Sequence, residues 1–156
     1  MSSSRRDGLR VDNLNVSFDD GRRLVVRDLS LEVASGEALG LVGESGSGKS
    51  LTCRAILGLL PPGARTSGRV SYDGQSLLDL DPSEMQSLRG SRIAMVFQDP
   101  MTALNPVLRV GDAIAQVVRA HDRVDKGTAR RRAVESMERV GIRNAGQRAS
   151  AYPHQF

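Results

Sequence analysis

Residues 43–50 read GESGSGKS, which matches the pattern G-x-x-x-x-G-K-[ST] in full. The glycines allow a tight backbone turn in which successive N–H groups point inward, toward a bound anion. Lys49 can then contact phosphate oxygens as a compact positive charge, and the Ser50 hydroxyl is placed to ligate Mg²⁺. This loop therefore predicts a site for the phosphates of a nucleotide.

The residues on either side supply the setting that such a loop requires. Residues 38–42, ALGLV, form a short apolar run typical of a buried parallel strand. After the loop, residues 49–60 carry apolar side chains at helical spacing, and PPG at 61–63 ends that pattern. A strand, a glycine loop and a helix in this order would place the phosphates on the helix N-terminus. The two flanks disfavour the alternative, a flexible Gly/Ser-rich turn.

Size and composition limit the classes of protein that the chain can represent. With 156 residues, 39% of them hydrophobic, the chain can hold one modest core. A net charge of only +4, 3% aromatic residues and no tryptophan argue against a nucleic-acid partner. We find no apolar run long enough to span a membrane and no signal-peptide core, so we expect a cytosolic chain. Cys53 is predicted to be a small buried side chain, with a reactive thiol as the alternative.

Several short strands are expected around the loop. An alternating pattern over residues 9–31, interrupted by DDGRR at 19–23, predicts an antiparallel hairpin or an edge sheet ahead of the loop. Residues 68–74 predict another strand, with a turn at Asp73-Gly74. In the first strand, one face should carry the apolar residues Leu14, Val16 and Phe18.

The middle of the chain carries a helix signal followed by a strand signal. Asp81 is a suitable N-cap, Pro82 suits the first helical position, and Glu84 can bond back to the cap, so a helix should run from there to Gly90. Residues 92–98 contain IAMVF and predict a second buried strand.

Two amphipathic helices are expected at the end of the chain, the second stopped by Gly141 as a C-cap. The arginines at 130–132 predict a solvated helix face with Arg131–Glu135 and Glu135–Arg139 ion pairs. A phosphate or partner patch is the alternative for these arginines. The helical spacing rests on two sets of residues: Val110, Ile114, Val117 and Val118, then Ala129, Ala133, Met137 and Val140.

The order of these motifs resembles the nucleotide-binding subunit of ABC transporters. LGLVGESGSGKS at 39–50 and MVFQDPMTALNP at 95–106 are similar to the branch that powers peptide and nickel importers. The resemblance implies an incomplete α/β P-loop NTPase fold, with an N-terminal antiparallel β-subdomain, a partial parallel core sheet and a partial helical subdomain. It also implies one partial nucleotide-binding domain over 1–156, with the β-subdomain and loop core over about 1–100 and the helical subdomain starting over about 101–156.

The resemblance also implies roles for individual residues. Phe18 would stack on adenine, or else pack within the β-subdomain. Gln98 would contact Mg²⁺ and the attacking water, and Ser50 would be a second metal ligand. A rival interpretation makes Asp99 the metal-binding acid at the end of the 93–97 run. The remaining contacts to the nucleotide would come from Gly43, Glu44, Ser45, Gly46, Ser47, Gly48, Lys49, Ser50 and Leu51.

The function implied by the resemblance is uptake of peptides or a related small solute, energised by ATP with Mg²⁺. Its partners would be a second nucleotide-binding subunit or half, in a head-to-tail dimer, and integral membrane permease subunits that contact the region from Gln98 to Pro106. The protein would then be cytoplasmic and peripheral, on the inner face of the cell membrane.

The printed sequence also departs from that family. It stops at YPHQF, residues 152–156, before the LSGGQ-type signature, the Walker B aspartate, the catalytic glutamate and the switch histidine. We therefore expect this chain alone to bind ATP rather than hydrolyse it, and to be marginally stable. Three alternatives remain: a non-hydrolysing nucleotide-binding fragment or truncated inactive product, a soluble ABC ATPase unconnected with transport, and a P-loop kinase that uses Arg65 and Arg69.

Overall fold

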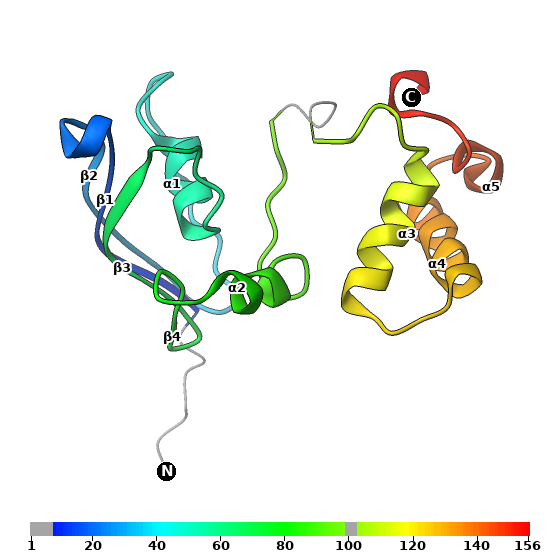
Figure 1. Ribbon diagram of the computed structural model, residues 1–156, viewed down its shortest axis with the longest axis horizontal. Helices are drawn as coiled ribbons and strands as arrows, with labels where there is room; N and C mark the ends of the chain where they lie inside the picture. Colours follow the sequence, from blue (N-terminus) through cyan, green and yellow to red (C-terminus); the bar gives the residue numbers. More distant parts are fainter. Residues whose placement is uncertain (1–7, 99–102) are drawn as a thin grey trace, which may run out of the picture. The chain divides into compact units, whose positions relative to one another are not determined.

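The computed structural model describes residues 8–98 and 103–156. The chain divides into two compact units, Met1–Arg89 and Gly90–Phe156 (Figure 1). The first unit contains the sheet and the glycine loop, and the second contains a pair of longer helices. The subdomain division near residue 100 stays a prediction.

The first unit is built on an antiparallel sheet with the strand order β2-β1-β3-β4. The predicted hairpin is confirmed, because β1 (Leu9–Phe18) pairs with β2 (Arg23–Val33). The other edge of β1 pairs with β3 (Arg65–Tyr72), which turns through Asp73-Gly74 into β4 (Gln75–Ser76). Both turn residues have positive φ, 49° and 81°, as a tight two-residue hairpin turn requires.

The central strand β1 supplies most of the core of this unit. Its Val11, Leu14 and Val16 are at most 1% exposed. Helix α1 (Lys49–Ile56) packs beside β1 and buries its own apolar face (Figure 1). The remaining core residues come from neighbouring elements: Val26 of β2, Val70 of β3, Thr52, Ala55 and Ile56 of α1, and Leu57, Leu77 and Met85.

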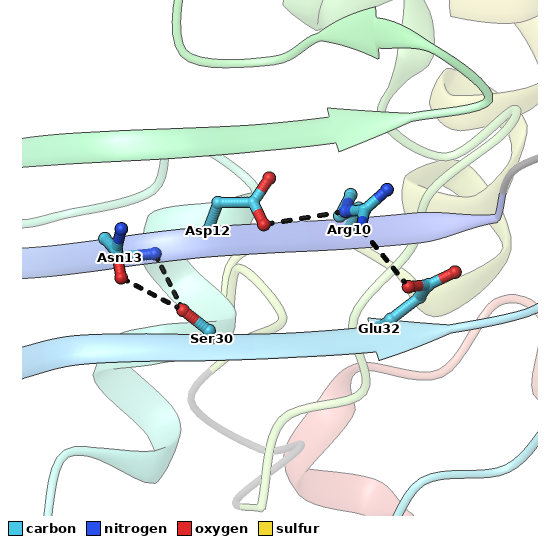
Figure 2. A network of polar contacts seen from close by, with 5 residues as sticks. All are labelled: Arg10, Asp12, Asn13, Ser30 and Glu32. Atoms are coloured by element: carbon cyan, nitrogen blue, oxygen red, sulfur yellow. Dashed lines mark hydrogen bonds and ion pairs between the residues drawn. The ribbon is translucent and has the colours of Figure 1, made fainter.

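A β-bulge explains why buried residues of β1 are three positions apart at Val11 and Leu14. The register of β1 shifts between Val11 and Leu14 against β2 and between Asp12 and Asn15 against β3, and Asn13 has φ +47°. The bulged Asn13 N–H donates to the Ser30 hydroxyl at 2.9 Å (Figure 2). A Cβ atom added at Gly68 of β3 would lie 2.3 Å from the Asn13 carbonyl oxygen, so the bulge requires glycine there.

The surface of the same hairpin carries a network of charged side chains. Arg10 lies 3.5 Å from a carboxylate oxygen of Asp12 and 3.7 Å from one of Glu32, which joins β1 to β2 (Figure 2). All three side chains are about half exposed or more, so these pairs contribute little to stability.

Helix α2 (Pro82–Leu88) begins as the sequence predicts. The Asp81 carboxylate accepts from the Ser83 and Glu84 N–H groups at 2.8 and 2.9 Å, and the Glu84 carboxylate accepts from the Asp81 N–H at 3.1 Å. The hydrogen bond from the Glu84 N–H is the main reason why the pKa of Asp81 is lowered. The helix ends at Leu88, and Gly90 follows with φ +79°.

The second unit is organised around α3 (Val110–His121) and α4 (Lys126–Arg139), followed by the short α5 (Ala145–Arg148). Both longer helices were predicted. Gly141 has φ +79°, and its N–H and that of Ile142 bond back to the Glu138 and Met137 carbonyls at 2.9 and 3.0 Å, which completes a Schellman cap. The buried cluster consists of Val110, Met137, Ala145 and Ala149, with Ile114, Val134 and Ile142 packed against it.

The ion pairs of α4 differ from the prediction. Among the described salt bridges, neither the Arg131–Glu135 pair nor the Glu135–Arg139 pair is present. Arg130 instead pairs with Asp112 of α3 at 3.1 Å, and Arg132 pairs with Asp122 just after α3. Arg131 and Arg139 themselves donate to hydroxyls one turn back on α4, that of Thr128 at 3.0 Å and that of Ser136 at 3.1 Å.

The two apolar runs predicted as buried strands are not paired strands. Residues 38–42 contain no regular structure, and Val42 is 91% exposed. The run at 93–97 is likewise irregular beyond Ile93, and Val96 is 93% exposed. A strand needs a neighbour for its N–H and C=O groups, and all the strand pairs formed by residues 8–98 and 103–156 are antiparallel ones within β1–β4.

Two further expectations about α1 were wrong. Cys53 is exposed, whereas Thr52, Ala55 and Ile56 form the buried face of the helix. The helix ends at Ile56 rather than continuing to residue 60, since Gly58 adopts φ +61°. No helix in the described part of the chain is long and apolar enough to cross a membrane.

Candidate nucleotide-binding site

The glycine loop, residues 43–50, leads directly into α1, with Gly48 as the N-cap residue of that helix. Gly48 has φ +92°, and a Cβ atom added there would lie 3.0 Å from Val26 Cγ2 of β2. At Gly43, an added Cβ atom would lie 2.9 Å from the Ser47 hydroxyl. At Gly48 the loop therefore needs glycine for its close approach to β2, whereas the hydroxyl beside Gly43 belongs to a side chain that can rotate.

Lys49 folds its side chain back over the loop. Its ammonium donates to the Gly43 and Glu44 carbonyl oxygens, both at 2.7 Å, and to the Ser47 hydroxyl at 3.2 Å. These acceptors match the three N–H donors of an ammonium group. The charge of Lys49 is thus held at the loop, surrounded by neutral oxygens that anionic oxygens could replace.

The first turn of α1 adds further donors. The backbone N–H groups of Lys49, Ser50 and Leu51 have no acceptor within an α-helix, because the first intrahelical bond is from the Thr52 N–H to the Gly48 carbonyl, at 2.8 Å. The helix dipole makes the same end positive. Both effects favour an anion at this loop, so the residues present fit the phosphates of a nucleotide.

Thr52 is a residue that the sequence reasoning missed. It is the buried polar residue of the described core, and its hydroxyl donates to the Gly48 carbonyl at 3.0 Å, the same oxygen that accepts from its N–H. These bonds tie the helix to the end of the glycine loop. A threonine four residues after a loop glycine is the signal that could have identified it, because Ser and Thr often bond to the carbonyl at i−4.

Phe18 lies in the same unit as the loop, at the end of β1. Its side chain is half-buried, unlike those of Leu14 and Val16 on the predicted common face. The Arg23 guanidinium lies over the ring, 5.2 Å from its centroid. The structure therefore leaves part of an aromatic surface accessible at this edge of the sheet, and adenine stacking there stays a prediction.

The other predicted site residues belong to the second unit or are not described. Gln98 is exposed and belongs to the Gly90–Phe156 unit, so its contact with the metal and water stays a prediction. Asp99, the rival metal ligand, lies outside the described residues.

Helices α3 and α4 line a separate cavity of about 460 Å³, whose charged side chains include Asp122 and Arg132. Those two residues form an ion pair, and Arg130 is paired with Asp112. Two of the three arginines at 130–132 are paired with carboxylates. The positive charge of this arginine cluster is therefore partly neutralised. The glycine loop remains the better candidate for an anion.

The chain is similar to ATP-binding proteins of peptide transport. The chain is 44% identical over 152 residues to the dipeptide transport ATP-binding protein DppD of Bacillus subtilis, covering 95% of this chain and 45% of that relative. It is 47% identical over 151 residues to the oligopeptide transport ATP-binding protein OppD of Mycobacterium tuberculosis, covering 95% of this chain and 25% of that relative. The chain thus spans less than half the length of these relatives.

Solved structures give the same fold. A dimeric structure described as a bacterial ABC transporter cassette superposes with a TM-score of 0.78 at 25% identity, covering 95% of this chain and 62% of that one. The predicted fold class, an ABC-type P-loop NTPase, is confirmed by this likeness. The ABC transporter family model matches residues 26–156. This match extends from β2 through the glycine loop to the last residue, and we conclude that the chain belongs to the ABC transporter family.

Proposed function

We propose that this chain is the ATP-binding part of an ABC importer ATPase that energises uptake of peptides, or of a related small solute, through a membrane permease. The observation that carries the proposal is the Gly43–Ser50 loop, in which a lysine ammonium and the first turn of a helix concentrate donors. The relatives named as dipeptide and oligopeptide transport proteins support the choice of solute.

Each part of the loop has a task in this function. The backbone N–H groups from Gly43 to Leu51 bind the phosphate oxygens, and Lys49 exchanges its bonds to the Gly43 and Glu44 carbonyls for bonds to phosphate. The exchange replaces neutral acceptors by charged ones, which form stronger hydrogen bonds with an ammonium. The other loop residues that would contact the nucleotide are Glu44, Ser45, Gly46, Ser47 and Gly48.

Mg²⁺ would be held by hydroxyl and amide oxygens in addition to phosphate. Ser50 is exposed in the first turn of α1, where its hydroxyl is available to a hard cation. Gln98 is the second proposed ligand, and its amide also orients a water molecule. When bound, the metal neutralises charge on the phosphates, and the protein side chains fix its position.

Partners and location follow from the same proposal. A second nucleotide-binding subunit or half would pair with this one head to tail, and the exposed Gln98, with the region that continues to Pro106, would contact the permease. The protein would then act at the cytoplasmic face of the cell membrane.

Binding of ATP to the complete protein tests the loop directly. Lys49→Ala should weaken Mg-ATP binding roughly tenfold to a hundredfold, the range expected for losing hydrogen bonds to charged groups. Lys126→Ala removes the chain's other lysine, which is exposed at the start of α4, and is the matched control. Equal affinities of the two variants by calorimetry would contradict the proposal.

Transport is tested separately, in cells that depend on this importer. The complete protein should restore uptake of labelled di- and oligopeptides, and the Lys49→Ala variant should not. Uptake by the Lys49→Ala variant at the wild-type rate would exclude an ATP-driven role for this loop. ATP binding without any uptake of peptides would favour a soluble ABC ATPase.

A further inference from the structure

The turn between β1 and β2 places the Arg23 guanidinium over Phe18, the residue proposed to stack on adenine. Phe18 and Arg23 are register partners at the end of the hairpin. The Arg23 guanidinium lies 5.2 Å from the Phe18 ring centroid, and its Nε lies 3.5 Å from a carboxylate oxygen of Asp19. One face of the ring is therefore covered by a side chain that also lies beside the Asp19 carboxylate.

The backbone that joins these two residues is in an uncommon conformation. Asp19 and Asp20 both have positive φ, 54° and 55°, followed by Gly21 at +92°. Asp20 is bonded to Arg65 of β3 at 2.7 Å, and the Arg22 N–H donates to the Asp19 carbonyl at 3.1 Å. Consecutive left-handed residues other than glycine persist only where surrounding contacts hold them.

The Phe18–Arg23 pair lies within the reach of one nucleoside from the glycine loop. Val16 of β1 pairs with Val26 of β2, and a Cβ atom added at Gly48 would lie 3.0 Å from Val26 Cγ2. Phe18 is two residues beyond Val16, which is about 7 Å along a strand. A phosphate at the loop and a base at Phe18 are thus separated by a distance that a ribose can bridge.

We propose that Arg23 is a positioning residue for the nucleobase. Its guanidinium covers one face of Phe18 and holds the ring in place, so that the base stacks on the opposite face. Cation–π contact keeps the guanidinium on the ring, and Asp19 limits its movement away from it.

Because this inference rests on the proposed function, the experiment separates base binding from phosphate binding. We would measure affinities of the complete protein for Mg-ATP and for tripolyphosphate, which has the phosphates but no base. Arg23→Ala should weaken ATP binding about two- to fivefold, as expected for an exposed cation–π contact, and leave tripolyphosphate binding unchanged. Arg23→Lys should retain part of the ATP affinity, since it keeps the cation.

Two further variants complete the test. In a Phe18→Ala background, Arg23→Ala should have no additional effect, because the arginine acts through the ring. Arg27→Ala, an exposed arginine on the same strand, is the matched control and should change neither affinity.

Several results would overturn the inference: unchanged or tighter ATP binding by Arg23→Ala, an equal loss for both ligands, or a loss that persists without Phe18. In each of these cases Lys49→Ala would still weaken both ligands, so the proposed function would stand. If Lys49→Ala changed neither affinity, both proposals would fall together.

Discussion

The contacts inside the two units of this chain differ in how far apart in the sequence their residues lie. In the sheet unit, the core residue Val11 lies opposite Leu31 on one side and Val70 on the other, so burial depends on residues far apart in the sequence. In the helical unit, α4 is delimited by its own neighbours: Asp125 caps its start and Gly141 its end. Local sequence signals were therefore sufficient to delimit α4 but did not determine all of the strands.

The largest expected effect lies in the sheet core. Leu14→Ala should lower the opening free energy of the β1 amides by about 2–5 kcal/mol, since the side chain is fully buried. Hydrogen exchange measures this quantity. Val42→Ala, at a position that is 91% exposed, is the control and should change it by less than about 0.5 kcal/mol. Comparable losses in both variants would mean that residues 38–42 are buried after all.

Replacing a glycine by alanine should lower the free energy of unfolding by a smaller amount, and the loss should differ between the two units. Gly68→Ala should cost about 1–3 kcal/mol for its backbone conformation, and more because the new Cβ would overlap the Asn13 carbonyl. Gly141→Ala has the same kind of φ but meets nothing within 4 Å, so only the backbone cost of about 1–2 kcal/mol is expected. Chemical denaturation of each variant decides the order. The reverse order would show that the bulge tolerates a side chain.

The ion pair between Arg130 of α4 and Asp112 of α3 should contribute still less to the free energy of unfolding. Arg130 and Asp112 are 47% and 42% exposed, so their coupling in a double-mutant cycle should be about 0–1 kcal/mol and should decrease with added salt. A coupling well above this range would make α3–α4 association electrostatic rather than apolar.

The smallest effect concerns the cap of α4 and depends on pH. The pKa of Asp125 is lowered, chiefly because the Thr128 hydroxyl donates to its carboxylate, with help from the Thr128 N–H. Its ionised form is therefore favoured in the folded chain. The stabilisation is present at neutral pH and is lost as the pH falls through the lowered pKa.

Asp125→Asn provides the test, because asparagine caps a helix nearly as well but does not titrate here. At neutral pH the exchange rates in the first turn of α4 should be close to those of the unsubstituted chain. In acid, only the unsubstituted chain should lose protection. An identical acid response of both chains would assign the loss to another carboxylate.

The sequence located the glycine loop and the helix caps better than it located the strands around them. The loop at 43–50, the N-cap Asp81 and the C-cap Gly141 are recognisable from a few adjacent residues, because a phosphate loop or a cap is local chemistry. Apolar runs such as 38–42 and 93–97 show only that burial would be favourable, and no strand lies beside either run among the described residues. The contact of Arg23 with Phe18 depends on strand register, which no local pattern specifies.

By itself, the sequence located the glycine loop of the candidate site, the β1–β2 hairpin, and helices α2, α3 and α4. Only the tertiary structure showed that Lys49 bonds to its own loop, that Thr52 ties α1 to Gly48, and that Arg23 lies on the Phe18 ring. The reason is physical: residue type and short spacing fix which groups can donate or accept. Which of those groups meet is decided by strand register, bulges and packing between distant segments.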